Sequence, residues 1–388
     1  MLLIGSRTVT STSPILGRRA TRGWCPGVLD PMETGDGWLL RVRLPGGVIE
    51  ASQMRLVSAV ADEHGSGQVD ITSRGNLQIR GVAVDRIKPA ADQLVHSGLA
   101  LPDAAADARR AVVASPLAGN DETAVGDSSA VVAEWLTCDW SGTLPSKFGI
   151  VVDDGGRWNL SSVDADVRLR ASDTGWSVQL RGAAQPTGWT LDPVSVLARA
   201  ATACANRSLR MDAVVAEVGC EEALALLGAE LRMGRATVRT TSDRLLGIVD
   251  HPGADRCNVI AAPFLGRVDA LTVSVLADRA AELGAAVRFT NDHSVALCGV
   301  PLASVASVLG TLSDMDFAVS ADDARSALSA CVGSRGCSWA NADTWLIAEQ
   351  MARTVPSPGR LHLSACAKAC GAPAGVRHMV AASNGRFQ

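Results

Sequence analysis

The sequence predicts an α+β fold with an internal duplication, and two observations carry this prediction. First, the alternation from Trp38 to Leu44 is typical of a strand, residues 51–64 have apolar positions at helical spacing, and residues 69–82 form a second strand-like segment. Second, sliding the chain against itself by about 218 positions places the same element order on residues 253–300. A shared element order at one offset favours duplication over chance identity.

The ungapped offset pairs Pro45 with Pro263 and Val57 with Val275, among other positions. Between the copies, alternating segments and a helical stretch at 212–232 indicate a mixed α+β region, and Asp153-Asp154-Gly155-Gly156 is typical of a hairpin turn. After the second copy, residues 302–330 look helical and lead to a cysteine-rich end.

The last residues predict a hairpin. The segment from Val376 to Ala382 is strand-like, and Asn384-Gly385 is a type I′ turn signal. The chain stops at Gln388 with hardly any returning strand. Either the partner strand comes from elsewhere or the protein is shortened here.

Composition indicates a soluble globular protein of two or three domains. The chain has 388 residues, 47% hydrophobic and 20% charged, with a net charge of −4. A net charge of this sign does not indicate the basic surface that binds nucleic acid. No apolar stretch reaches the roughly 20 residues of a membrane helix. The apolar start, Met1 to Gly5, is too short for a signal peptide. We therefore expect a cytoplasmic protein without nucleic-acid or membrane partners.

Four cysteines form two close pairs near the end of the chain, Cys331 with Cys337 and Cys366 with Cys370. Four converging thiolates can hold a [4Fe–4S] cluster, and the small residues between them let backbone N–H groups approach the sulfurs. Structural zinc is an alternative, although zinc sites favour C-x2-4-C pairs. Disulfides are a further alternative, which the expected reducing compartment disfavours.

A polar row in the first copy is the candidate binding surface. In an extended strand, Arg74, Asn76, Gln78 and Arg80 project to one face while Leu77 and Ile79 point to the core. Such a row could bind carboxylates through bidentate arginine contacts. The equivalent positions of the second copy hold Asp292, Ser294, Ala296 and Cys298. The alternative is a solvated face of a half-buried sheet.

At these motifs the chain resembles the sulfite and nitrite reductase superfamily, and most closely its precorrin-3B synthase branch. The stretches that carry the resemblance are both cysteine pairs and Arg22-Gly23-Trp24-Cys25-Pro26-Gly27, Thr72 to Gly81, Ser115-Pro116-Leu117-Ala118-Gly119 and Leu144-Pro145-Ser146-Lys147-Phe148-Gly149. The resemblance implies a duplicated sulfite/nitrite-reductase-like α+β architecture. Its expected parts are two ferredoxin-like half-domains at 22–88 and 240–305, a larger mixed domain at 105–235, and a cluster domain at 306–388.

The resemblance also implies an activity and a set of site residues. It implies an oxygen-dependent monooxygenase that hydroxylates the tetrapyrrole precorrin-3A at C20 and closes a γ-lactone in cobalamin biosynthesis. The implied cofactors are a [4Fe–4S] cluster and a mononuclear non-haem iron. The cluster ligands would be Cys331, Cys337, Cys366 and Cys370, and the substrate carboxylates would meet Arg74, Asn76, Gln78, Arg80, Lys147 and Lys368.

Two positions depart from the pattern of the superfamily. The reductases have a basic residue where Ser146 stands, which argues against anion reduction, and Asn291-Asp292-His293 replaces a Pro-Trp-Arg-like segment. No His-x-Asp/Glu pattern nominates ligands for a mononuclear iron, and His362 is only the histidine nearest the second cysteine pair.

The sequence also bears on the electron donor and on rival functions. No G-x-G-x-x-G follows a strand, so the electrons should come from a ferredoxin or an NAD(P)H-dependent reductase. The first rival is a sirohaem-dependent sulfite or nitrite reductase. The second is a cluster- or zinc-bearing scaffold without catalysis. Catalytic residues stay unassigned.

Overall fold

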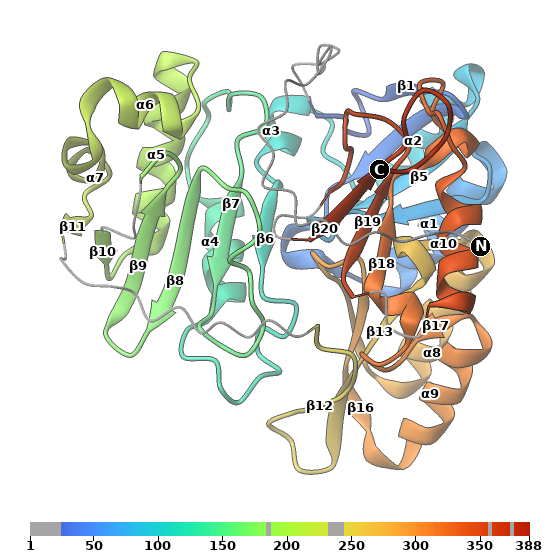
Figure 1. The fold of residues 1–388 in the computed structure, drawn as a ribbon. Helices are drawn as coiled ribbons and strands as arrows, with labels where there is room; N and C mark the ends of the chain where they lie inside the picture. The colour runs from blue at the N-terminus through green and yellow to red at the C-terminus, as the bar shows by residue number, and fades with distance from the viewer. Residues whose placement is uncertain (1–24, 184–187, 232–243, 356–358, 373–375) are drawn as a thin grey trace.

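The computed structural model describes residues 25–183, 188–231, 244–355, 359–372 and 376–388. The chain is an α+β protein with two lobes (Figure 1). One lobe, on the left of the figure, holds β6 to β11 with α4 to α7. The other holds two related half-domains and the unit that carries the paired cysteines. Of the motif at residues 22–27, the first three residues lie outside the described part of the chain.

The first half-domain is built on a five-stranded sheet with the order β1-β2-β5-β4-β14. Helices α1 and α2 cover it, and Met54, Val57 and Ala61 of α1 are fully buried. A Glu50–Gln53 capping box starts α1. The elements are β1 (Met32–Thr34), β2 (Gly37–Val42), β3 (Val48–Ile49), α1 (Ala51–His64), β4 (Gln68–Ile71), β5 (Leu77–Val82) and α2 (Ile87–His96).

The second half-domain repeats this arrangement with the strand order β12-β13-β16-β15-β3, and β17 pairs with β13. The two half-domains exchange strands. The β14 strand of the second copy pairs with β4, and β3 of the first copy pairs with β15. The elements are β12 (Gly247–Asp250), β13 (Arg256–Pro263), β14 (Arg267–Asp269), α8 (Ala270–Leu283), β15 (Ala286–Phe289), β16 (Val295–Pro301), α9 (Val305–Asp314) and β17 (Phe317–Ala318). Because each sheet contains strands from both copies, the sheets do not mark a boundary between the copies. The predicted domain ranges stay predictions.

The ungapped alignment of the two copies is wrong by one residue in the helices. Helices α1 and α8 begin at residues 51 and 270, which are 219 positions apart, whereas β4 and β15 begin at 68 and 286, which are 218 apart. The structure therefore pairs Val57 with buried Leu276 and not with Val275. The cause is the loop after the helix, which has three residues in the first copy and two in the second.

The segment at 69–82 is not one strand, because a tight turn divides it into the antiparallel pair β4 and β5. In this turn the Thr72 hydroxyl accepts hydrogen bonds from the backbone N–H groups of Arg74 and Asn76. Gly75 has φ +68°, and a Cβ there would lie 2.5 Å from the carbonyl oxygen of Phe289. Arg74 thus lies on a turn, and it does not continue the strand face of Gln78.

The other lobe holds a six-stranded sheet with the order β11-β10-β9-β8-β7-β6. Strands β6, β7 and β8 are parallel, so Asp153 to Gly156 begin a crossover and not the predicted hairpin. The expected helix at 212–232 is two helices separated by Gly219. The elements are α3 (Ala104–Ala108), β6 (Val112–Ala114), α4 (Ser128–Thr137), β7 (Ile150–Asp153), β8 (Val167–Ser172), β9 (Gly175–Leu180), β10 (Gly188–Thr190), α5 (Pro193–Arg207), α6 (Met211–Val218), α7 (Cys220–Leu227) and β11 (Glu230–Leu231).

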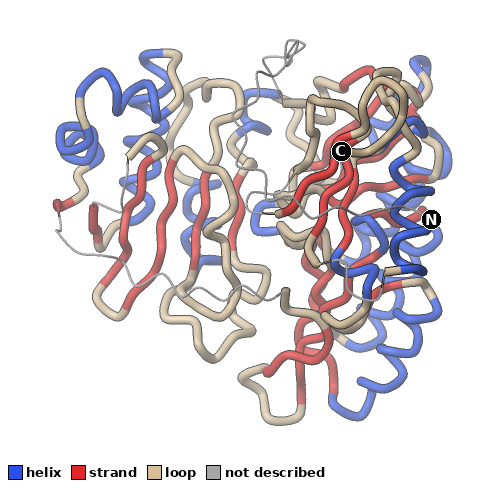
Figure 2. The backbone as a smooth tube through the Cα atoms, viewed as in Figure 1, coloured by secondary structure: helices blue, strands red, loops and turns tan. Residues whose placement is uncertain are grey.

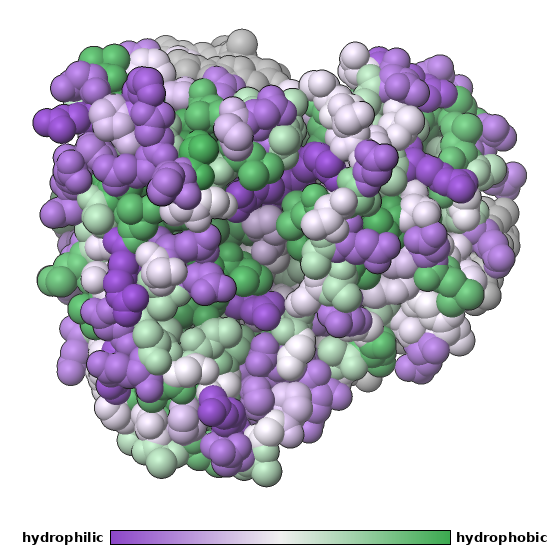
Figure 3. Space-filling model, turned by 180° about the vertical axis from the view of Figure 1, so that it is seen from behind, coloured by the Kyte–Doolittle hydropathy of each residue, from purple (hydrophilic) through white to green (hydrophobic). Residues whose placement is uncertain are grey.

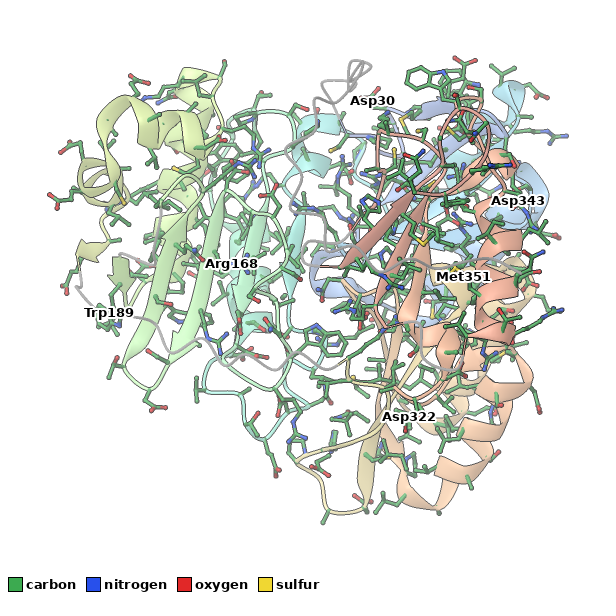
Figure 4. The ribbon with its side chains drawn as sticks, viewed as in Figure 1. Asp30, Arg168, Trp189, Asp322, Asp343 and Met351 are labelled. Atoms are coloured by element: carbon green, nitrogen blue, oxygen red, sulfur yellow. The ribbon has the colours of Figure 1, made fainter. Side chains whose placement is uncertain are left out.

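A small sheet of three parallel strands carries the paired cysteines. Its order is β18-β19-β20, with β18 (Leu328–Ala330), β19 (Leu361–Ser364) and β20 (Arg377–Val380), and α10 (Thr344–Thr354) packs beside it. Figure 4 labels Asp343, which caps α10, and Met351 on the same helix. The helix expected over 302–330 ends at Asp314.

The C-terminal hairpin does return within the chain. The backbone of Gln388 exchanges two hydrogen bonds with Val380, and Ala382 N–H donates to Arg386. The turn is not type I′, because only Gly385 has a positive φ, +77°. A short returning segment is therefore present within the chain, and the alternative of a shortened protein stays a prediction.

Helices gather on the outer side of the half-domain lobe and strands lie inside it (Figure 2). The largest buried cluster joins both half-domains through Val57, Ile79, Leu276 and Phe289. Viewed from behind, hydrophobic and hydrophilic residues are intermixed, and the surface is hollowed between the lobes (Figure 3). Among the described residues, no helix has the length and apolarity needed to cross a membrane.

Candidate functional site

A cationic cavity of about 410 Å³ lies between the first half-domain and the other lobe. Asp30 contributes to its wall, and Figure 4 shows this residue near the upper end of the boundary between the lobes. The basic residues that line the cavity come from four separate segments of the chain. They are Arg41 and Arg43 from β2 and its end, Arg74 from the β4–β5 turn, Lys147 from the loop before β7, and Arg210 before α6.

Among the described residues, Arg41 and Arg74 form no ion pair, although the Asp164 carboxylate lies close enough to favour the charged form of Arg74. Arg41 donates to the Gln78 side chain at 2.7 Å and makes a hydrogen bond with the Cys25 thiol. Arg74 donates to the backbone carbonyl of Asp164. Burial lowers the pKa of Arg41 to about 10, so its guanidinium is charged at neutral pH, and burial also lowers the pKa of Arg74.

Two other arginines of the cavity are neutralised. Arg43 forms an ion pair with Asp107, and Arg210 forms one with the fully buried Asp166 at 2.6 Å. Their positive charge is therefore largely balanced inside the protein. The attraction for an added anion comes mainly from the residues without such partners, Arg41, Arg74 and Lys147.

Lys147 has φ +67°, a left-handed conformation that is uncommon for a residue with a side chain. Backbone strain of this kind costs energy and is found preferentially at functional sites. Lys147 lines the cavity and is exposed. Its ammonium group can thus meet a ligand that enters from solvent.

The remaining residues of the predicted row support the cavity or lie outside it. Asn76 lines the cavity and accepts the Leu44 N–H at 2.9 Å, which holds the end of β2. Gln78 does not line the cavity, but its side-chain oxygen accepts a hydrogen bond from Arg41 and so helps to hold that guanidinium in place. Arg41 itself escaped the sequence analysis, although alternation along β2 puts Arg41 and Arg43 opposite the buried Leu40 and Val42.

Arg80 does not line the cavity. Its guanidinium makes two 2.9 Å contacts with Asp36, lies 3.3 Å from Asp70, and is only 5% exposed. It also approaches the carbonyl oxygen of Gly336, at 3.4 Å, in the loop that joins Cys331 to Cys337. Arg80 therefore connects the first half-domain to the first cysteine pair.

The four paired cysteines lie together at the ends of β18 and β19. Cys331 follows β18 and accepts the Ala365 N–H at its sulfur, at 3.2 Å, while Cys366 follows β19. The pKa of the Cys370 thiol is raised by partial desolvation and by the charges of the other three paired cysteines, while the nearby Lys368 acts in the opposite direction. The four sulfurs are thus within electrostatic range of one another.

The positions of the cysteines bear on the zinc and disulfide alternatives, which stay open. All ten cysteines are free thiols. Within the described ranges, no three His, Cys, Asp or Glu side chains converge closely enough for a single metal ion. A cubane cluster places four irons between its cysteine sulfurs, so its ligands stand farther apart than those around one ion. The absence of a closely converging set of three ligands among the described residues is therefore compatible with a cluster held by the four thiols.

A second cavity of about 410 Å³ adjoins the first, since Arg74 and Asp164 line both. It reaches the unit with the paired cysteines, because Ser329 and Ala372 contribute to its wall. His293 also lines it, with its Nδ1 2.7 Å from the Ile71 carbonyl. The two cavities together form a path from the cationic residues toward the cysteine pairs.

Lys368 and His362 lie outside the lining of both cavities. Lys368 is exposed and its Nζ is 5.3 Å from the centre of the Trp339 ring. His362 is 2% exposed, its ring lies 5.1 Å from that of His378 on the neighbouring strand in a tilted arrangement, and its Nδ1 contacts Ser329 Oγ. Burial lowers the pKa of His362 to about 4, so its ring is neutral at physiological pH.

Comparison with known proteins identifies the family. Residues 30–96 match the nitrite/sulfite reductase ferredoxin-like half domain. The chain is 30% identical to a precorrin-3B synthase from Sinorhizobium sp over 382 residues, covering 91% of this chain and 79% of the relative. The chain belongs to the sulfite and nitrite reductase superfamily.

Further members of the superfamily agree with this assignment. A ferredoxin–nitrite reductase from Leptolyngbya laminosa is 26% identical, covering 90% of this chain and 77% of the relative. The solved NirA structure from Mycobacterium tuberculosis has the same fold, with a TM-score of 0.72 over 86% of this chain and 69% of that one, at 20% identity. These superfamily members are oxidoreductases, and this chain is an enzyme of that general kind.

Proposed function

We propose that the protein is a precorrin-3B synthase, which hydroxylates precorrin-3A at C20 and closes a γ-lactone. In such a monooxygenation, one atom of O2 enters the product and the other leaves as water, which consumes two electrons and two protons. The observation that carries the proposal is the cationic cavity, which Arg41, Arg74 and Lys147 line without forming an ion pair among the described residues. The similarity to the Sinorhizobium protein supports the choice of substrate.

A carboxylate-rich macrocycle suits the charge and shape of this region. Guanidinium groups bind carboxylates in bidentate geometry, and burial strengthens such contacts by lowering the local dielectric. The adjoining second cavity gives a flat ring room to extend toward the paired cysteines. In this proposal Arg41, Arg74 and Lys147 bind carboxylates, while Asn76 and Gln78 hold the arginine-bearing segments in position. Lys368, outside both cavities, stays a sequence prediction.

Cys331, Cys337, Cys366 and Cys370 would hold a [4Fe–4S] cluster. Such a cluster supplies electrons one at a time when bound. The Ala365 N–H directed at Cys331 is the kind of hydrogen bond that stabilises a thiolate ligand. For a separate mononuclear iron, the described residues do not gather a set of three ligands, so we derive no step through one.

The electron donor would be an acidic redox protein such as a ferredoxin. The unit that carries the paired cysteines is basic, although the whole chain has a net charge of −4. Its acidic residues over 328–388 are Asp343 and Glu349, against the basic residues Arg335, Arg353, Arg360, Lys368, Arg377 and Arg386. Opposite charges steer redox partners together and accelerate association.

The test is the visible spectrum, iron and acid-labile sulfide of anaerobically purified protein, followed by turnover of precorrin-3A with O2 and a reductant. A broad cluster absorption and formation of precorrin-3B are expected. Sirohaem bands together with sulfite or nitrite reduction would refute the proposal in favour of a reductase. A cluster without any turnover would indicate a scaffold without this activity.

A further inference from the structure

A third cavity, of about 470 Å³, lies where three parts of the fold meet. One wall comes from the loop before β3, one from α4, and one from β15 of the second half-domain. The walls are mostly apolar, and they include Val48, Leu101, Val132 and Leu136. Volume and lining are those of a small-molecule site, which is typically apolar with a few polar groups that fix orientation.

Arg288 is the unusual residue of this cavity. Among the described residues, none accepts a hydrogen bond from Arg288 or forms an ion pair with it; its Nε is buried, and the side chain as a whole is half-buried. The nearby Cys298 does not compensate the charge, because burial raises the pKa of its thiol to about 11. This half-buried guanidinium lies beside apolar walls and has no counter-charge among the described residues, so it is open to an added anion.

The other two arginines of the cavity differ from Arg288 because their terminal nitrogens have partners, although the Nε of each is also buried without a hydrogen bond. Arg109 donates to the carbonyls of Trp135 and Trp140 and stacks on both rings, at 5.1 and 5.5 Å. Arg110 donates to the carbonyls of Gly98 and Arg43. Arg288 is therefore the arginine of this cavity whose terminal nitrogens are left for an added anion.

We propose that this cavity binds a small carboxylate with an apolar body, whose carboxylate meets Arg288 and whose body packs on the α4 wall. The site is distinct from the cationic cavity, and the inference does not rest on the proposed function. The short helix α3 separates the two, since Ala104 and Asp107 line the cationic cavity while Ala106 lines this one. A ligand here would thus contact the same helix as the cationic cavity.

Isothermal titration calorimetry of the purified holoprotein with decanoate tests the proposal, with decan-1-ol as the uncharged probe of equal chain length. Saturable decanoate binding that decan-1-ol does not match is expected. A charge-assisted contact contributes about 1.5–3 kcal/mol, which is roughly a 10- to 100-fold change in affinity. The absence of saturable decanoate binding at millimolar concentration, or equal binding of both probes, would overturn it.

Variants locate the site. Arg288→Ala should weaken decanoate binding at least about tenfold, Arg288→Lys should restore part of it, and Ala133→Trp should fill the cavity from the exposed face of α4. The matched control is Arg86→Ala, an exposed arginine away from the cavity lining. Circular dichroism and iron content should be unchanged in all variants. Wild-type affinity in both Arg288→Ala and Ala133→Trp would place the binding elsewhere and refute the proposal.

Discussion

The carboxyl group of Asp154 offers a quantitative test of the structure. Asp154 follows β7, is fully buried, and accepts the Gly156 N–H at 3.0 Å, while its Oδ2 has no hydrogen-bond partner among the described residues. Burial raises its pKa from 3.8 to about 6, with a further contribution from the neighbouring charges of Asp153 and Asp121. Replacing Asp154 by Asn keeps the shape of the side chain and removes the charge.

The sign and size of the effect follow from the pKa difference. Because the folded protein binds this proton more tightly than the unfolded chain does, the stabilisation is complete below pH 3.8 and is lost as the pH rises through 6. A shift of roughly two pKa units corresponds to about 3 kcal/mol in total. Between pH 5 and pH 8 the expected loss is about 1.4 kcal/mol.

Urea unfolding of the anaerobic holoprotein, followed by tryptophan fluorescence at pH 5 and pH 8, measures this loss. Relative to the wild type, the free energy of unfolding of Asp154→Asn should increase by about 1.4 kcal/mol when the pH rises from 5 to 8. The control is Asp173→Asn, an exposed aspartate in the β8–β9 turn, which should follow the wild type. A stability difference between Asp154→Asn and wild type that does not change with pH would refute the reasoning.

Three further predictions concern the candidate site. Cys366→Ser should lower iron and acid-labile sulfide to a small fraction of wild type, whereas Cys220→Ser should leave both unchanged; equal loss in the two would argue against the proposed ligands. Arg41→Ala should weaken tetrapyrrole binding roughly 10- to 100-fold through loss of a charged contact, with cluster content retained, as measured by equilibrium titration. Arg80→Ala should instead shift the reduction potential or the electron paramagnetic resonance signal of the cluster, because Arg80 contacts the loop of the first cysteine pair. Tetrapyrrole affinity should stay near wild type. Weaker tetrapyrrole binding with an unchanged cluster signal would instead indicate that Arg80 binds the substrate.

Local patterns in the sequence predicted the elements whose causes are local. The helix over 51–64 was predicted with its correct bounds, because its apolar period and the following Gly65 are sufficient signals. The turn at Gly75 was missed, since its requirement for glycine comes from Phe289, more than 200 residues away. A polar alternation alone did not distinguish a turn residue from a strand residue.

The candidate site was predicted only in part for the same reason. Arg74 and Arg80 look equivalent in sequence, but the partners of Arg80 are Asp36, Asp70 and Gly336, which come from three other segments. Only the folded chain shows that Arg74 lines the cationic cavity while Arg80 is held by carboxylates outside it. Arg41 could have been found by applying the same alternation argument to the preceding strand.

The exchange of β3 and β14 between the half-domains bears on the origin of the chain. Each copy completes the sheet of the other, as two identical subunits do across a twofold axis. The repeat therefore has the form of a homodimer whose subunits were fused by gene duplication. Fusion then allowed the copies to diverge, so that Gly75 and Arg74 persist in one turn while Asp292 and His293 occupy the other. A single copy, expressed alone, should expose an unpaired strand edge and associate with a second copy.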